Sequence, residues 1–199
     1  MPGLSGISPP PSLPPGPPPL GVQLAAGLHG AFLLARGRQE GLGFALLSPE
    51  GAARSFVAAL LCLPFYLSLR VIGDEGVGPS LHALLMDALS YAIGWAAFPL
   101  ISLGLARALG REGRWTLFIA NWNWSSFVQY AALLLAALLP PGPFGAVAGL
   151  VALGYALWLG WFVSTRALGI GAVQGVGVVL LDLLLGAVIV EAARAVSGA

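Results

Sequence analysis

The side chains that could do chemistry in this chain are few, and two of them lie deep inside apolar segments. Asp182 stands in the middle of the apolar run 172–192, and Asp87 lies roughly two turns inside the run 81–106. A carboxylate at the centre of a membrane-spanning helix costs about 2.5–3.5 kcal/mol on insertion scales, so acids at such depth are candidate functional sites. The pattern predicts an intramembrane polar site that includes Asp182 and Asp87.

A polar stripe on a third apolar segment could complete this site. Asn121, Ser125 and Gln129 recur every four residues, which places them on one face of a helix. Amides and hydroxyls in lipid are unfavourable unless paired, so this face should look at other helices. We expect Gln129 and Ser125 to hydrogen-bond with Asp182. Two interpretations stay open: a structural clamp between two helices, and a titrating site coupled to transport.

No catalytic or metal-binding constellation accompanies these residues. His29 and His82 lie far apart in the sequence, and the single cysteine, Cys62, sits in an apolar run. The chain has no HExxH, no GxSxG and no phosphate-binding glycine loop. One cysteine excludes an intrachain disulfide and a cysteine-based zinc cluster. The sequence therefore predicts a protein that is not an enzyme and has no cofactor.

The composition indicates which kind of elements must position the polar site. Apolar residues make up 58% of the chain and charged residues 9%, against about 25% charged in soluble domains. So few charges cannot cover a water-facing surface. The net charge is near zero with no basic patch, which argues against a nucleic-acid partner. The expected fold class is all-α, a polytopic transmembrane helix bundle whose partner is the lipid bilayer.

Five segments in residues 46–199 are long and apolar enough for spans. The segment 115–139 holds 25 residues without a charge, and such a helix crosses a hydrocarbon core of about 30 Å. The other expected spans are about 55–72, 81–106, 144–164 and 172–192. Small residues at helical spacing should let these helices approach closely. The helix-packing glycines are Gly145, Gly149, Gly160, Gly171, Gly175 and Gly186.

The N-terminal region differs in composition from the expected spans. Residues 1–20 hold nine prolines, which predicts a disordered tail. Residues 21–45 begin with an apolar run that is too short to cross a bilayer, so we expect an interfacial or re-entrant amphipathic helix there. A sixth span in this region would place Arg36 and Arg38 inside the bilayer, and we reject it.

The arginines predict the direction of the spans. Seven of the nine would lie on the side of the N-terminus, and only Arg70 and Arg194 on the other side. Basic residues favour cytoplasmic loops, so the expected topology has a cytoplasmic N-terminus and an outer C-terminus. All nine basic residues are arginine, a usage typical of GC-rich bacterial genomes. We therefore expect a multi-pass protein of the bacterial inner membrane.

The order of these features forms a familiar pattern. A cytoplasmic N-terminal region precedes five closely spaced spans and a very short outer C-terminus. Leu47-Ser48-Pro49-Glu50 opens the first span, and Thr165-Arg166-Ala167-Leu168-Gly169 leads toward Val179-Leu180-Leu181-Asp182. Over roughly residues 30–195 the chain resembles the Yip family (Ypt-interacting proteins) of small polytopic membrane proteins. The resemblance implies a non-enzymatic protein that works through helix contacts and contacts with a protein partner or a second copy.

The alternative is a small transporter or channel subunit that uses Asp182 and Asp87 together with the polar stripe. A continuous polar cavity that links Asp87, Asn121, Gln129 and Asp182 would favour transport. A closed and dry bundle would favour a protein that works through its outer contacts.

Overall fold

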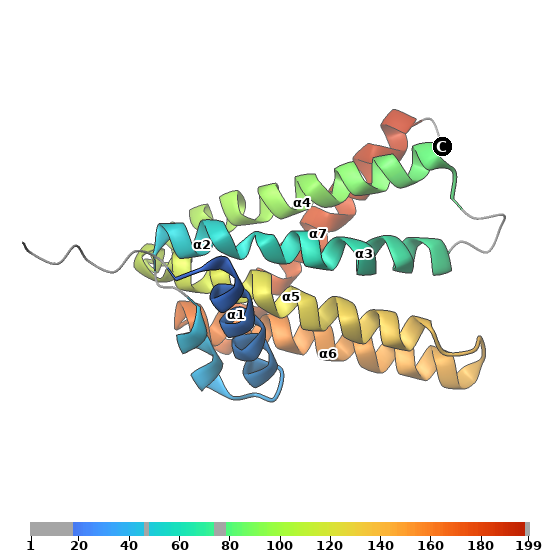
Figure 1. The fold of residues 1–199 in the computed structure, drawn as a ribbon. Coiled ribbons are helices and arrows are strands. Elements are labelled where there is room, and N and C mark those ends of the chain that lie inside the picture. Colours follow the sequence, from blue (N-terminus) through green and yellow to red (C-terminus); the bar gives the residue numbers. More distant parts are fainter. Residues whose placement is uncertain (1–17, 46–47, 74–78, 198–199) are drawn as a thin grey trace, which may run out of the picture.

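The computed structural model describes residues 18–45, 48–73 and 79–197, and every regular element in these ranges is a helix. The predicted all-α fold class is therefore confirmed. Most of the tail predicted to be disordered lies outside the described residues. Figure 1 shows the long helices side by side in one bundle, with the first helix across one flank. In chain order the elements are α1 (Leu20–Leu34), η1 (Gln39–Phe44), α2 (Pro49–Ser55), α3 (Val57–Ile72), α4 (Leu81–Ala108), η2 (Glu112–Arg114), α5 (Trp115–Ala137), α6 (Pro143–Leu168) and α7 (Ala172–Ser197).

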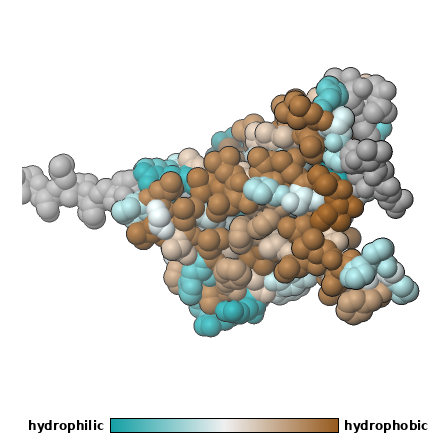
Figure 2. All heavy atoms as spheres, turned by 45° about the vertical axis from the view of Figure 1, so that its right-hand side comes forward, coloured by the Kyte–Doolittle hydropathy of each residue, from teal (hydrophilic) through white to brown (hydrophobic). Residues whose placement is uncertain are grey.

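Within the described ranges, four stretches of helix are long and apolar enough to cross a membrane. They are Pro49–Ile72, which consists of α2 and α3 together, followed by α4, α6 and the part of α7 from Ala172 to Ala193. Their outward faces carry large apolar side chains; Leu60 is 69% exposed and Leu150 is 70% exposed. Figure 2 shows hydrophobic residues over the middle of one face of the molecule. Length and composition thus indicate a membrane protein, because lipid is the solvent that such a surface favours.

The fifth predicted span, α5, is a helix of 23 residues that is not among those four. Its amides and hydroxyls lower its hydropathy, and these groups are the reason for the difference. All nine residues from Phe118 to Ser126 are buried. Helices α1, α2, α3 and α6 pack around α5. It is therefore the central helix of the bundle, and its polar groups face protein.

Capping residues explain where several helices begin and end. The Ser48 side chain accepts a hydrogen bond from the Gly51 amide at 3.0 Å, with Pro49 in the first turn of α2. Ser80 caps α4 in the same way, through the Ala83 amide at 3.2 Å. Gly169 ends α6 in the left-handed conformation, with φ of 67°. The first span was predicted at about 55–72. In the structure the apolar helical stretch begins earlier, at Pro49, because α2 continues through Phe56 into α3.

Helix α1 docks on the bundle through glycines. It packs against η1 and α5. Gly30 and Gly41 bring the two backbones so close that a Cβ atom on Gly30 would stand 2.7 Å from the Gly41 carbonyl oxygen. Gly27 faces the indole ring of Trp124 with no room for a side chain. The segment expected to be an interfacial helix is thus a short apolar helix held against the others.

One end of the bundle gathers most of the arginines, and polar contacts tie its connections together. Arg114 donates a hydrogen bond to the Arg166 carbonyl at 3.0 Å, where the carbonyl end of α6 carries partial negative charge. Arg107 pairs with Glu112 at 2.8 Å beside η2. We call this end, where α4 and α6 finish and α5 begins, the arginine-rich end.

Candidate functional site

A cavity of about 480 Å³ lies among the long helices, and α4, α5, α6 and α7 supply most of its lining. In Figure 1, α7 crosses the bundle obliquely toward the start of α4, and it packs against both α4 and α6. At the end opposite the arginine-rich end, α4 and α7 lie apart from α5 and α6. The volume falls within the range of about 300–1,000 Å³ that is typical of small-molecule sites.

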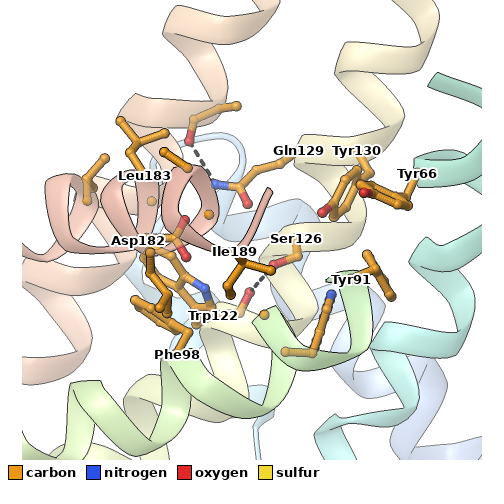
Figure 3. A pocket seen from close by; sticks show the side chains of 18 of the residues that line it. Tyr66, Tyr91, Phe98, Trp122, Ser126, Gln129, Tyr130, Asp182, Leu183 and Ile189 are labelled. Carbon is orange, nitrogen blue, oxygen red and sulfur yellow. Dashed lines mark hydrogen bonds between the residues drawn. The ribbon is translucent and has the colours of Figure 1, made fainter. Parts of the chain in front are cut away.

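Asp182 is the acidic group of this cavity. It lies on one face of α7 with Val179, Gly186 and Ile189, at the spacing of three to four residues that brings helical side chains together. Figure 3 shows its carboxyl group on the α7 wall. Among the described residues, no side chain or amide donates a hydrogen bond to it, and no arginine lines the cavity. The predicted site residue thus faces open space.

Aromatic rings form much of the remaining wall. Tyr66, Tyr91 and Tyr130 come from three different helices, with ring centroids 4.8 to 6.3 Å apart. On the other side of the cavity, Phe98 and Trp122 stack with centroids 4.7 Å apart. With Trp95 of α4, six aromatic side chains line the cavity. Figure 3 shows the rings of Tyr66 and Tyr130 next to each other.

Gln129 lines the same cavity as Asp182, but the hydrogen bond expected between them is not made. The Gln129 side-chain amide donates to the Ala156 carbonyl of α6 at 2.8 Å. The small residues of α6 are the physical reason, since α5 approaches so closely that a Cβ atom on Gly160 would lie 3.4 Å from Gln129 Nε2. The amide NH₂ group therefore pairs with α6, and Asp182 on α7 is left without it.

Asn121 and Ser125, the other members of the predicted stripe, lie away from the cavity. Asn121 donates to the Leu117 carbonyl at 2.9 Å and lies 3.4 Å from the Leu42 carbonyl oxygen. The Ser125 hydroxyl is buried without a hydrogen-bond partner among the described residues. Ser125 therefore does not make the predicted contact with Asp182.

Asp87 lies outside the cavity. Its carboxylate pairs with Arg70 of α3 at 2.9 Å, and both side chains are partly exposed. Ser90, Tyr91 and Gly94, which follow Asp87 along α4, do line the cavity. The structure thus brings two of the five predicted site residues, Asp182 and Gln129, to one cavity and distributes the others elsewhere.

The predicted helix-packing glycines have different surroundings. Gly160 packs against Trp122 and Gln129, and Gly175 packs against Thr165 and Trp161. A Cβ atom on Gly149 or on Gly186 would meet open space. The nearest atoms belong to Pro140 for Gly145 and to Gln174 for Gly171, so these two glycines face their own connections.

Asn123 is a structural residue that the predicted stripe leaves out. Its amide donates to the Ser55 hydroxyl at 2.8 Å, and that hydroxyl donates to the Ala52 carbonyl at 2.6 Å. This chain of hydrogen bonds joins α5 to α2. The signal in the sequence was the amide on the opposite face of α5, which needs a partner of its own in a membrane.

Comparisons of the chain with protein-family models, with curated protein sequences and with solved structures find no match.

The described residues hold no group of three or more histidine, cysteine or acidic side chains placed for a metal ion. The cavity hydroxyls of Ser90 and Ser126 donate to carbonyls one turn back on their own helices, at 2.8 and 3.0 Å. The groups that a bound molecule can contact include the Asp182 carboxyl, the Gln129 carbonyl oxygen, the hydroxyls of Tyr66 and Tyr130, and the aromatic faces. Such an arrangement can bind a molecule through charge, hydrogen bonds and stacking.

Proposed function

We propose that this chain is a multi-pass integral membrane protein of Yip-like type that works through non-covalent contacts rather than catalysis. The observation that carries this proposal is the arrangement of the last five long helices. Helices α3 to α7 follow one another with short connections and alternate in direction (Figure 1). The polar central helix α5 is wrapped by its neighbours, which supports a fifth span alongside the four apolar ones.

The proposed location is the inner membrane of a bacterium, with the arginine-rich end in the cytoplasm and the C-terminus outside. The excess of arginine at one end of the bundle supports this orientation. Helix α1 would then lie at the cytoplasmic interface, beside the start of α5.

Cysteine labelling tests the five spans and their direction together. In a Cys62→Ala background, Pro141→Cys should react with a membrane-impermeant maleimide on intact cells, and Gly113→Cys only after lysis. Neither position is packed against other elements, so both variants should fold. Labelling of position 141 only after lysis would contradict the topology.

The mode of action has its own test. Size measurement of the protein in mild detergent, after crosslinking in intact membranes, should show a second copy or one protein partner in fixed ratio. A species that stays monomeric and uncrosslinked under conditions that preserve its fold would contradict action through protein contacts.

A second candidate, binding or transport of a small molecule, is favoured by one specific observation. The cavity holds Asp182 without a hydrogen-bond partner among the described residues, in the middle of the helix that carries it. The cavity includes Gln129 but neither Asp87 nor Asn121, so it is shorter than the continuous polar path that a channel would need. Binding of a discrete molecule is the form of this candidate that the geometry supports.

A further inference from the structure

The charge of the cavity restricts what it can bind. Among the described residues of the lining, Asp182 is the one acid, and none is an arginine or a histidine. A carboxylate surrounded by apolar helices is stabilised strongly by a cation, because charges interact more strongly where water is scarce. An anionic molecule would meet the same carboxylate at close range and be repelled. The cavity is therefore complementary to positive charge.

The aromatic lining favours an organic cation over a metal ion. A metal ion needs several oxygen ligands at short distances, whereas Asp182 is the one acidic side chain among the described residues of the lining, and no group of three metal-binding side chains lies there. Six aromatic side chains surround the space instead. The negative face of an aromatic ring attracts ammonium and phosphonium groups, most strongly where the site is desolvated. Tyr66, Tyr91 and Tyr130 together form such a wall.

The apolar part of the lining restricts the rest of the molecule. Leucine, valine, isoleucine and alanine side chains of α6 and α7 complete the wall. The cavity is partly open to the outside of the bundle, and Leu183, which lines it, is 45% exposed. A molecule that enters along this apolar flank must carry apolar groups around its charge.

We propose that the cavity binds a lipophilic organic cation, with Asp182 as the counter-charge and the aromatic side chains around the cationic group. This inference rests on the second candidate function above and names its ligand class. Gln129 contributes its carbonyl oxygen, because its NH₂ group is held by Ala156. A cation with N–H groups can donate to that oxygen.

Three probes of similar shape and different charge test the inference. They are tetraphenylphosphonium (positive), tetraphenylborate (negative) and tetraphenylmethane (neutral). Binding is measured by equilibrium dialysis against the full chain in phosphatidylcholine nanodiscs, with protein-free nanodiscs as the baseline for partition into lipid. The variants are Asp182→Asn, which keeps the shape of the side chain, and Asp87→Asn as the matched control. Asp87 suits this role because it pairs with Arg70 outside the cavity.

Tetraphenylphosphonium should bind saturably to the wild type and to Asp87→Asn. Asp182→Asn should weaken this binding on the order of thirtyfold, as expected for loss of one partner of a buried charge pair. Tetraphenylborate should bind to nanodiscs that contain the protein no more than it binds to protein-free nanodiscs. Equal binding of all three probes, unchanged by Asp182→Asn, would overturn the ligand class but leave small-molecule binding standing. Absence of saturable binding for all three would overturn both.

The aromatic contribution is tested separately at Tyr130. Tyr130→Phe keeps the ring and should bind tetraphenylphosphonium within about threefold of the wild type, whereas Tyr130→Leu should weaken it about fivefold or more. A circular dichroism spectrum and thermal midpoint for each variant show whether the bundle is intact. If Tyr130→Leu folds and binds as tightly as Tyr130→Phe, the cation is not recognised by this ring.

Discussion

The two halves of α5 use polar residues in different ways. Toward the arginine-rich end, Asn121 and Asn123 are buried and each amide donates to a partner, although Asn123 also borders the cavity. Farther along, Gln129 and Tyr130 line a cavity that also contains the Asp182 carboxyl. The first region is closed by hydrogen bonds between helices, and the second leaves an acidic group facing open space.

The two regions show two different surroundings for polar side chains in one bundle: one is paired between helices, and the other faces a cavity. An amide buried with its partner stabilises the contact between two helices, because lipid offers no alternative partner. An acid without a protein partner does not stabilise the bundle, and its presence needs another reason. The cavity supplies that reason if a bound cation completes it.

The largest effect is expected where α1 closes the arginine-rich region. Gly30→Ala would place a Cβ atom 2.7 Å from the Gly41 carbonyl oxygen and 2.9 Å from Phe44 Cβ, so the backbones must separate. We expect a loss of about 2 kcal/mol in the free energy of unfolding, measured by denaturant titration in mixed micelles. Gly21→Ala on the same helix meets open space and is the control, with no loss of stability expected. Equal effects of the two changes would show that α1 is not docked as described.

A smaller effect is expected from the hydrogen bond that joins α5 to α2. A double-mutant cycle with Asn123→Ala and Ser55→Ala should give a coupling energy of about 1–2 kcal/mol, because both groups are buried. Ser126 bonds to its own helix, so the cycle of Asn123→Ala with Ser126→Ala should give a value near zero. A coupling energy with Ser55 that is no larger than that with Ser126 would show that Asn123 does not join α5 to α2.

The smallest effect is expected at the ion pair of Arg70 and Asp87. Both side chains are partly exposed, and pairs of this kind contribute about 0.2–1 kcal/mol. A cycle with Arg70→Gln and Asp87→Asn should give a coupling in this range at low salt, and a smaller value at 1 M salt. Coupling that persists at high salt would indicate that the pair is buried in the assembled protein. Asp87 would then stabilise the contact between α3 and α4, as Asn123 stabilises that between α5 and α2.

The helices could be predicted from the sequence because each depends on local signals. Uninterrupted apolar runs give their positions, and residues such as Ser48, Ser80 and Gly169 mark their ends. The sequence also predicted the helix α5 and its polar residues, but it did not predict that α5 lies at the centre of the bundle. That place depends on which helices surround it, and helical periodicity alone does not define the neighbours of a polar face.

The site was predicted only in part, for a related reason. Asp182 and Gln129 were identified because ionisable and amide groups at membrane depth are rare. The wrong step was to pair them, since complementary groups at similar depth can each face a different neighbouring helix. Gln129 contacts α6, which Ala156 and Gly160 bring close. The three tyrosines were missed because they come from three helices and share no spacing in the sequence.

One pair of variants tests the distinction between the two regions most directly. Asn123→Leu and Asp182→Leu make comparable changes of a polar to an apolar side chain, one in each region. Thermal unfolding of both variants in the same detergent should show a lower midpoint for Asn123→Leu, with a loss of about 2 kcal/mol, because Ser55 loses its donor. Asp182→Leu should unfold at the wild-type midpoint or above it. A midpoint for Asp182→Leu that falls as far as that of Asn123→Leu would show that Asp182 is structural, and would contradict its role in the cavity.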